Sequence, residues 1–262
     1  MQDYYEEVIK IKREGKKAAL ATIIRTQGST PREVGVKMLV REDGSISGTI
    51  GGGRLEAAVI KDALDTLAAG EPRTVHYDLT GVEASKVGMI CGGALDVYLE
   101  PILSGPKVFL FGGGHVSLSV ARLSKMAGFR VAVIDDRPEF ANRERFPEAE
   151  EVIAEEFSSA LKKLKTARES YLVILTRGHA YDQETLEWAL GTEARYVGMI
   201  GSRKKVQTVF SNLKEKGVSE EKLNSVHSPI GMDIGAETPE EIAVSIVAEM
   251  IRERRKGKGG GG

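Results

Sequence analysis

The sequence predicts an α/β protein in two domains, and a change of pattern at residues 104–106 divides them. Before this segment, short apolar stretches are joined by turns, which indicates an antiparallel sheet. After it, short apolar strands alternate with helical patterns, which is typical of a parallel sheet with helices on both faces. We therefore expect a mixed α+β domain over residues 1–103, a Rossmann-like doubly wound parallel sheet over 107–255, and a flexible tail over 256–262.

Composition and charge exclude several classes of protein. With 37 basic and 38 acidic residues among 262, the chain has no overall attraction to nucleic acid or to an anionic membrane. No apolar run approaches the ~20 residues of a membrane span, and the N-terminal residues lack the pattern of a signal peptide. A single cysteine, Cys91, excludes an internal disulfide, so we expect a cytoplasmic protein without nucleic-acid or membrane partners.

The first domain should open with an amphipathic helix over residues 4–14, which Gly15 ends. A second helix has an apolar face at helical spacing, and Gly70 fits as its C-terminal stop. The other elements of this domain are expected as strands at 18–25, 36–41, 46–50, 74–79 and 94–101, with the second helix running to about residue 69.

A run of three glycines at residues 51–53 precedes the second helix. Such a loop offers unpaired backbone N–H groups to an anion, although three glycines at a strand–helix junction are also compatible with a purely structural turn. A second loop, at residues 26–35, is dense in turn-forming residues and carries Arg32, which favours the anion-binding interpretation.

Cys91 stands between Ile90 and the pair Gly92 and Gly93, so its thiol has little steric cover from its neighbours in the sequence. A thiolate is both a nucleophile and a soft metal ligand. The alternative is a small buried hydrophobic residue without reactivity. The sequence leaves both interpretations open.

The second domain shows strict alternation of strands and helices. Thr238, Pro239 and Glu241 predict the start of its last helix, because they supply a cap, a proline at the first helical position and a capping-box glutamate. The preceding elements are expected as strands at 107–111, 130–134, 151–154, 171–176 and 196–200 and helices at 115–127, 157–167, 182–190 and 203–216.

The first strand of this domain leads into three more glycines, at residues 112–114, and then into a helix, which is the context of a dinucleotide-binding fingerprint. Ser117 replaces the third glycine of the fingerprint and is small enough for close helix–strand packing. Asp135 lies where an acidic residue would bond a ribose hydroxyl. Arg137, close by, could bind the 2′-phosphate of NADP, so the sequence does not decide between NAD and NADP. In the alternative interpretation, the glycines only form a tight turn.

Three polar clusters follow later strands, at residues 176–179, 201–205 and 227–235, where open parallel sheets bind their ligands. His179 and His227 are candidate acid–base groups or metal ligands, but no close metal-binding spacing is present. Arg203 begins a helix, where a cation opposes the helix dipole, and this favours a bound anion.

Eight stretches, in order, resemble the xanthine dehydrogenase accessory factor family (XdhC/CoxI type) along essentially the whole chain. They are ATIIRTQGSTPR (21–32), GGGRLE (51–56), MICGG (89–93), FGGGH (111–115), VIDDRPEF (133–140), TRGH (176–179), YVGMIGSR (196–203) and PIGMDIG (229–235). The resemblance implies an N-terminal XdhC/CoxI-type domain and a C-terminal Rossmann domain. It also implies a maturation factor that binds molybdenum cofactor (molybdopterin), protects it during sulfuration and delivers it to a molybdenum hydroxylase such as xanthine dehydrogenase.

The resemblance further implies as partners a molybdenum hydroxylase apoenzyme and a sulfurtransferase, and it is compatible with a homodimer. On this analogy Cys91 lies near molybdenum or the sulfur as a reactive residue and metal ligand, and His179 is a second candidate for chemistry. The expected cofactor-binding residues are Arg32, Gly51, Gly52, Gly53, Glu56, Gly112, Gly114, His115, Asp135 and Arg203.

Two other functions stay open at this point. An NAD(P)-dependent oxidoreductase would bind its nucleotide at residues 112–114 and use His179 or His227 as an acid. Cys91 would then have no role in the reaction. A nucleotide-sensing regulatory protein would bind a nucleotide without chemistry. We expect a cofactor-insertion chaperone rather than a turnover enzyme; the client enzyme and the identity of the nucleotide, whether NAD, NADP or part of the cofactor, are left open.

Overall fold

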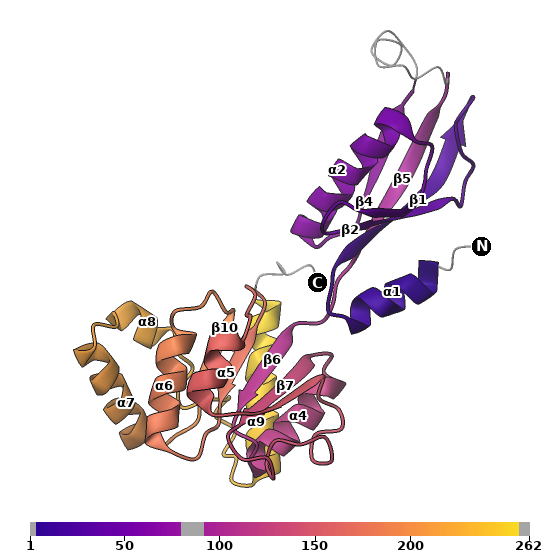
Figure 1. Cartoon of the computed structure of the whole chain (residues 1–262). Coiled ribbons are helices and arrows are strands. Elements are labelled where there is room, and N and C mark those ends of the chain that lie inside the picture. Colours follow the sequence, from indigo (N-terminus) through magenta and orange to yellow (C-terminus); the bar gives the residue numbers. More distant parts are fainter. Residues whose placement is uncertain (1–3, 80–91, 257–262) are drawn as a thin grey trace. The chain divides into compact units, whose positions relative to one another are not determined.

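The computed structural model describes residues 4–79 and 92–256 of the chain. The chain forms two compact units, Met1–Gly105 (unit 1) and Pro106–Gly262 (unit 2), and each is described by itself (Figure 1). None of the described helices is long and apolar enough to cross a lipid bilayer.

Unit 1 is built on a five-stranded antiparallel sheet. Its strands are β1 (Ala18–Gln27), β2 (Lys37–Arg41), β3 (Ile46–Gly48), β4 (Arg73–Asp78) and β5 (Ala94–Ile102). They lie in the order β3-β2-β1-β5-β4, so the long strand β1 occupies the centre. The register of β1 against β5 shifts between Ile23 and Arg25, near the end of β1 that leads into the loop at 26–35.

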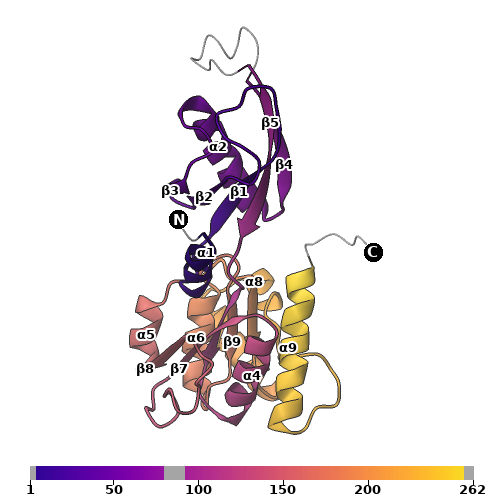
Figure 2. The same cartoon turned by 90° about the vertical axis from the view of Figure 1, so that its right-hand side faces the viewer.

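Side chains alternate across this sheet, so each face can pack against a different helix. Ala19, Ala21 and Ile23 belong to the core that includes the apolar residues of α2 (Gly53–Ala69). Ala18 and Leu20, on the other face, pack with α1 (Tyr4–Arg13). Figure 2 labels both helices together with the strands of unit 1. The helices therefore lie on opposite faces of the sheet because β1 is apolar on both.

Unit 2 contains a five-stranded sheet whose strand pairs are all parallel. The strands are β6 (Lys107–Phe111), β7 (Arg130–Asp135), β8 (Glu151–Ala154), β9 (Tyr171–Ile174) and β10 (Tyr196–Met199), in the order β10-β9-β6-β7-β8. Every residue of β9 and β10 is buried, as expected for strands covered on both faces.

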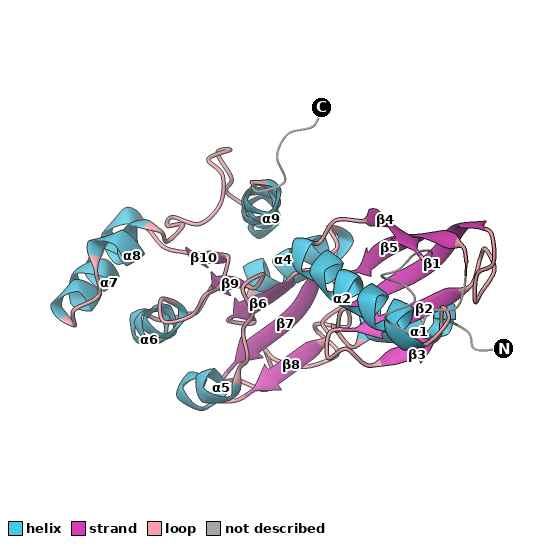
Figure 3. Cartoon of the chain, turned by 90° about the horizontal axis from the view of Figure 1, so that it is seen from above, coloured by secondary structure: helices cyan, strands magenta, loops and turns pink. Residues whose placement is uncertain are grey.

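Helices cover both faces of this parallel sheet (Figure 3). The helices are α4 (His115–Met126), α5 (Phe157–Lys163), α6 (His179–Ala189), α7 (Arg203–Glu215), α8 (Glu220–Asn224) and α9 (Pro239–Arg255). α4 and α9 pack on one face, in a core around Val120 and Ile246. α5, α6 and α7 pack on the other, in a core around Leu161, Leu186 and Val209. This is the doubly wound arrangement.

The structure confirms the predicted fold class, an antiparallel N-terminal domain and a Rossmann-like C-terminal domain. The largest differences concern three helices. The helix expected over 157–167 ends at Lys163, because Leu164 is extended with ψ 133°. The helix expected over 182–190 starts earlier, at His179. The short α8 was not expected, since its five residues bury only Leu223 and show no periodic pattern.

Candidate functional site

The glycine loop 51–53 of unit 1 joins β3 to α2 in a conformation that other residues rarely adopt. Gly51, Gly52 and Gly53 have φ values of 142°, 75° and 59°. A Cβ on Gly51 would meet Pro31 Cγ at 2.6 Å, whereas a Cβ on Gly52 or Gly53 would meet nothing within 4 Å. Gly52, the N-cap residue of α2, has no side chain that could cap the helix. Among the described residues, the space beside Gly52 and Gly53 is therefore open to a ligand.

The side chain of Glu56, predicted to line the cofactor site, is hydrogen-bonded to the segment that leads into the glycine loop. The Thr49 hydroxyl donates a hydrogen bond to Glu56 Oε2, and the backbone N–H of Gly51 donates to Thr49 Oγ1 at 3.2 Å. Glu56 therefore links the first turn of α2 to the loop that precedes it.

Two further predicted stretches of unit 1 lie directly against each other. A Cβ on Gly93 would collide with the carbonyl oxygen of Gln27 and meet that of Ser29 at 2.5 Å. A Cβ on Gly28, whose φ is 70°, would meet Gly92 O at 3.0 Å. Because Pro31 also touches the glycine loop, the three segments 27–31, 51–53 and 92–93 form one cluster, which we call the glycine cluster.

Arg32 extends from the glycine cluster as an exposed side chain, with no ion pair to any residue of 4–79 or 92–256. Cys91, the predicted reactive residue and metal ligand, lies outside the described residues and directly precedes Gly92 in the sequence. Among the described residues, no group of three or more histidine, aspartate or glutamate side chains is arranged to hold a metal ion.

The second glycine loop, at residues 112–114 of unit 2, is packed differently. Gly112 has φ 108°, and a Cβ there would collide with the Leu175 carbonyl. A Cβ on Gly113 would meet Phe140 O at 2.5 Å, whereas one on Gly114 would meet nothing within 4 Å. The predicted tight turn is present, and two of its glycines are required by close backbone approach.

Asp135, predicted to bond a ribose hydroxyl, is buried, and both oxygens of its carboxylate accept hydrogen bonds from the chain itself. Its carboxylate accepts bonds from Gly113 N at 2.7 Å and Arg137 N at 3.0 Å. The Arg137 guanidinium adds bonds of 2.9 and 3.0 Å. Burial raises the pKa of Asp135, but these hydrogen bonds outweigh it and hold the pKa below its ordinary value. A ribose hydroxyl would have to displace one of these donors.

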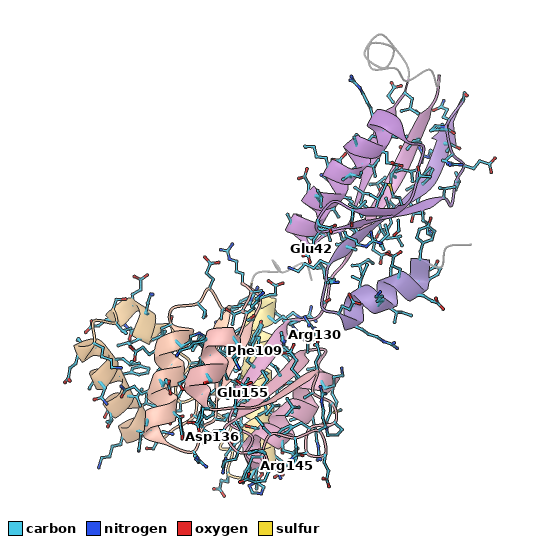
Figure 4. All side chains as sticks on the ribbon, viewed as in Figure 1. Glu42, Phe109, Arg130, Asp136, Arg145 and Glu155 are labelled. Carbon is cyan, nitrogen blue, oxygen red and sulfur yellow. The ribbon has the colours of Figure 1, made fainter. Side chains whose placement is uncertain are left out.

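The next carboxylate, Asp136, ties the end of β7 to the loop after β9. Arg177 Nη2 donates to Asp136 Oδ2 at 2.6 Å, and the Tyr181 hydroxyl lies 3.3 Å from the same oxygen. Arg145 Nη2 donates to the carbonyl of Gly113 at 3.2 Å. Figure 4 shows Asp136 and Arg145 at the same edge of unit 2. The chain's own side chains thus surround this glycine loop.

The other predicted residues near the fingerprint occupy helix starts. Ser117 is fully buried in the first turn of α4, which agrees with its predicted packing role. His115 and His179 are the exposed first residues of α4 and α6, and neither bonds through its side chain to another residue in the described ranges. Their predicted roles in cofactor binding and chemistry stay predictions.

A buried ion pair joins α6 to α7. Asp182 is fully buried; its Oδ1 accepts a 2.6 Å bond from the Thr176 hydroxyl, and its Oδ2 pairs with the ammonium of Lys205. Lys205 is therefore neutralised within the chain, unlike Arg203 in the same helical turn, which has no ion-pair partner among the described residues.

A pocket of about 650 Å³ lies beyond the carboxyl end of β10. It brings together two of the predicted polar clusters, because the turn into α7 and the loop after His227 both line its wall. Its lining residues are Ile200, Gly201, Ser202, Arg203, Pro229, Ile230, Gly231, Met232, Asp233, Ile234, Gly235, Ala236, Ile242 and Ser245.

A buried carboxylate, Glu249 of α9, fixes the loop of this pocket. Its oxygens accept bonds from the Tyr196 hydroxyl at 2.7 Å, Gly231 N at 2.9 Å and Arg252 at 3.0 Å, and His227 Nδ1 lies at 3.3 Å. Burial raises the pKa of Glu249, but the bonds from His227, Tyr196 and Gly231 outweigh it and lower the pKa to about 2. His227, a predicted acid–base candidate, is thus paired and stacks on Tyr196 at 4.5 Å.

Sequence reasoning missed Glu249 and Ser245. Both stand among the apolar residues Ile242, Ile246 and Met250 of the last helix and are buried with them. A polar residue within a buried helical stripe needs a partner, so this pattern was the available signal.

Two protein-family models match this chain. A model of the XdhC Rossmann domain matches residues 108–250, more than half of the chain, and a model of the XdhC and CoxI family matches residues 11–78. The chain belongs to the XdhC and CoxI family. The predicted family is confirmed, and the XdhC Rossmann domain contains both the fingerprint loop and the pocket at β10.

Individual relatives agree with this assignment. The uncharacterized protein YqeB of Escherichia coli is 38% identical over 98% of this chain and 47% of its own length. A probable xanthine dehydrogenase subunit of Bacillus subtilis is 30% identical over 62% of this chain and 47% of its own length. The chain thus spans about half the length of these two relatives.

Two more distant proteins cover most of both chains. The molybdenum cofactor insertion chaperone PaoD of Escherichia coli is 21% identical over 92% of this chain and 84% of its own length. A crystal structure of a xanthine dehydrogenase from Bacillus halodurans has a TM-score of 0.55 at 24% identity and covers 97% of this chain and 96% of that chain. The latter shows a shared fold.

Proposed function

We propose that this chain is a maturation factor that binds molybdenum cofactor, protects it during sulfuration and delivers it to a molybdenum hydroxylase such as xanthine dehydrogenase. The observation that carries the proposal is the alignment with a molybdenum cofactor insertion chaperone across both units, over 92% of this chain. Membership of the XdhC and CoxI family supports it.

The glycine cluster of unit 1 is the part of the chain that fits the cofactor best. Molybdopterin carries a phosphate, and the uncapped start of α2, the open faces of Gly52 and Gly53 and the unpaired Arg32 suit an anion. In this proposal Cys91, next to Gly92, supplies a thiolate to molybdenum or to the transferred sulfur. Glu56 keeps the loop in place through Thr49.

The partners in this proposal are a molybdenum hydroxylase apoenzyme and a sulfurtransferase. The Bacillus subtilis relative, named as part of a probable xanthine dehydrogenase, supports a link to that class of enzyme. A homodimer and a cytoplasmic location are parts of the same proposal, and the mass of the purified chain in solution tests the first.

An anaerobic titration with molybdenum cofactor tests the proposal. Compared with wild type, we expect Cys91→Ala and Arg32→Ala each to raise Kd about tenfold, because each removes a charged contact. The matched control is Arg13→Ala, which removes another exposed cation, at the end of α1. Cys91→Ala should also abolish sulfuration of the partner enzyme in a coupled assay. Absence of cofactor binding by wild type would refute the proposal.

An NAD(P)-dependent oxidoreductase is the second candidate. It is favoured by the open face of Gly114 and by the start of α4, which no side chain caps. The carboxylate of Asp135 counts against an oxidoreductase, because its oxygens already accept hydrogen bonds from Gly113 N and Arg137. Binding of NAD(P) without binding of molybdenum cofactor, together with nicotinamide turnover, would make this the leading function; nucleotide binding that only changes partner affinity would favour a regulatory protein.

A further inference from the structure

The pocket beyond β10 has the size of a small-molecule site and does not involve the glycine cluster of unit 1. Its volume of about 650 Å³ lies within the range of ligand pockets, roughly 300–1,000 Å³. Three segments form it: the turn from β10 into α7, residues 229–236, and α9. Glu249 holds this wall in place by accepting a bond from Gly231 N.

One end of the pocket is suited to an anion. α7 has 13 residues, and Ser202 caps it by accepting a bond from Lys205 N at 3.3 Å. The backbone N–H groups of Arg203 and Lys204 have no acceptor among the described residues. Arg203 lines the pocket as an unpaired cation at the positive end of the helix dipole, an unfavourable position that a bound anion would relieve.

The hydroxyl of a largely buried serine supplies independent evidence for a ligand. Ser245 is only 4% exposed and lines the pocket, yet its Oγ makes no hydrogen bond to any residue that the structure describes. The hydroxyl faces Gly231, where a Cβ would collide with it. The oxygen is not among the fully enclosed side-chain atoms that lack a partner, so it is open to a ligand atom in the pocket.

The remaining wall is apolar and carries one carboxylate. Met232 and Ile234 are 37% and 53% exposed, and both line the pocket beside the partly buried Ile242. Exposed apolar side chains at a pocket provide a surface for a flat ring. The carboxylate of Asp233 accepts hydrogen bonds and offers no donor, so it suits a ring that bears N–H donors.

We propose that this pocket binds a phosphate ester of a flat heterocycle with N–H donors, the chemistry that guanine nucleotides and pterin phosphates share. The phosphate lies at the start of α7 with Arg203 and Ser245, and the ring lies against Met232 and Ile234 with its N–H edge toward Asp233. A pterin phosphate shares its chemistry with the cofactor proposed for unit 1, so the variants and the amide shifts described below show at which of the two sites it binds.

Calorimetric titration of the full chain tests the proposal with four probes: GMP, a pterin monophosphate, guanosine and inorganic phosphate. We expect at least one of the two esters to bind, and guanosine and inorganic phosphate to bind at least tenfold more weakly than that ester. Arg203→Ala should weaken binding of the ester by about 10- to 100-fold, and Ser245→Ala by about fivefold. Lys204→Ala keeps the backbone N–H at that position and removes only the neighbouring exposed cation, whose side chain lies outside the pocket lining, so it is the control and should leave Kd unchanged.

Amide shifts of Gly201, Gly231 and Gly235 in a nuclear magnetic resonance titration locate the site, and unchanged spectra elsewhere show that the variants fold. The proposal fails if neither ester binds, if inorganic phosphate binds as tightly as the esters, or if Arg203→Ala binds as well as Lys204→Ala. Cys91→Ala should bind the ester normally, so failure at this pocket and failure of the function proposed for unit 1 are distinguishable.

Discussion

The two runs of three glycines, at residues 51–53 and 112–114, have the same sequence and each precedes a helix, but their glycines are required for different reasons. In unit 1 all three have positive φ, and a Cβ on two of them would meet open space. In unit 2 only Gly112 has positive φ, and a Cβ on Gly112 or Gly113 would collide with or crowd a backbone carbonyl. One loop depends on backbone conformation, the other on close approach.

This difference bears on which loop is a ligand site. At residues 112–114, backbone carbonyls from two other loops and the carboxylate of Asp135 already occupy the space around the glycines. At residues 51–53, the N-cap residue of α2 is a glycine without a capping side chain, and a Cβ on Gly52 or Gly53 would meet no atom within 4 Å. A glycine motif therefore predicts a turn reliably, whereas its availability to a ligand is decided by segments distant in the sequence.

The largest expected effect is that of Gly113→Ala. The new Cβ would lie 2.5 Å from the carbonyl oxygen of Phe140, a backbone atom that can move only with its loop. Because Gly113 is not among the glycines with positive φ, the cost is steric, and we expect a loss of about 3 kcal/mol in the free energy of unfolding. Urea unfolding measures it. A loss below about 1 kcal/mol would mean that the two loops do not pack as described.

Asp135→Asn tests the carboxylate that holds the same loop. We expect a loss of about 2 kcal/mol, because Arg137 and Gly113 N lose a buried anionic acceptor. The folded-state pKa of Asp135 lies below its ordinary 3.8, so its stabilisation is present above that pH and is lost as pH falls through the folded pKa. Unfolding free energies at pH 7 and below pH 3 should show the gap between wild type and variant narrowing at acid pH; a constant gap would contradict the ion pair.

The sequence predicted what local patterns determine. The strand expected over 18–25 is present as β1, and the capping box of Thr238 and Glu241 is formed as expected, with Glu241 N donating to Thr238 Oγ1 at 3.2 Å. The strand–helix alternation after residue 106 was sufficient for the doubly wound sheet.

Contacts between distant segments were not predictable in the same way. The bond from Tyr196 to Glu249 joins residues 53 positions apart, and Phe140 reaches Gly113 from the loop after β7. Neither leaves a local pattern at the residue it affects. For this reason the sequence named Asp135 as a ribose ligand, whereas the structure shows that its oxygens are bonded within the chain.

Gly52→Ala probes the first loop, and we expect a loss of about 1.5 kcal/mol. Gly52 has φ 75° and ψ −179°, a region that is nearly exclusive to glycine, so the cost is conformational strain without a collision. The matched control for backbone strain is Gly44→Ala. Gly44 lies in the turn before β3 with φ 79°, and a Cβ there would likewise meet no atom within 4 Å. Both should destabilise the protein to a similar extent in urea unfolding, but only Gly52→Ala should weaken the binding of molybdenum cofactor. Equal cofactor binding by the two variants would separate the loop from the proposed site.

Gly114→Ala should have the smallest effect and sharpens the contrast within the second loop. Gly114 has φ −69° and open space where a Cβ would stand, so alanine fits without strain. We expect a change in the free energy of unfolding within about 0.5 kcal/mol, as for substitutions away from packed contacts.

The same variant separates two uses of this loop. Unchanged stability with lost NAD(P) binding would make residue 114 a phosphate contact, because the new methyl group would then exclude the ligand and nothing else. If NAD(P) binding is also unchanged, or absent from the start, the glycines at 112 and 113 are required for packing alone, and the fingerprint of this unit is a structural turn.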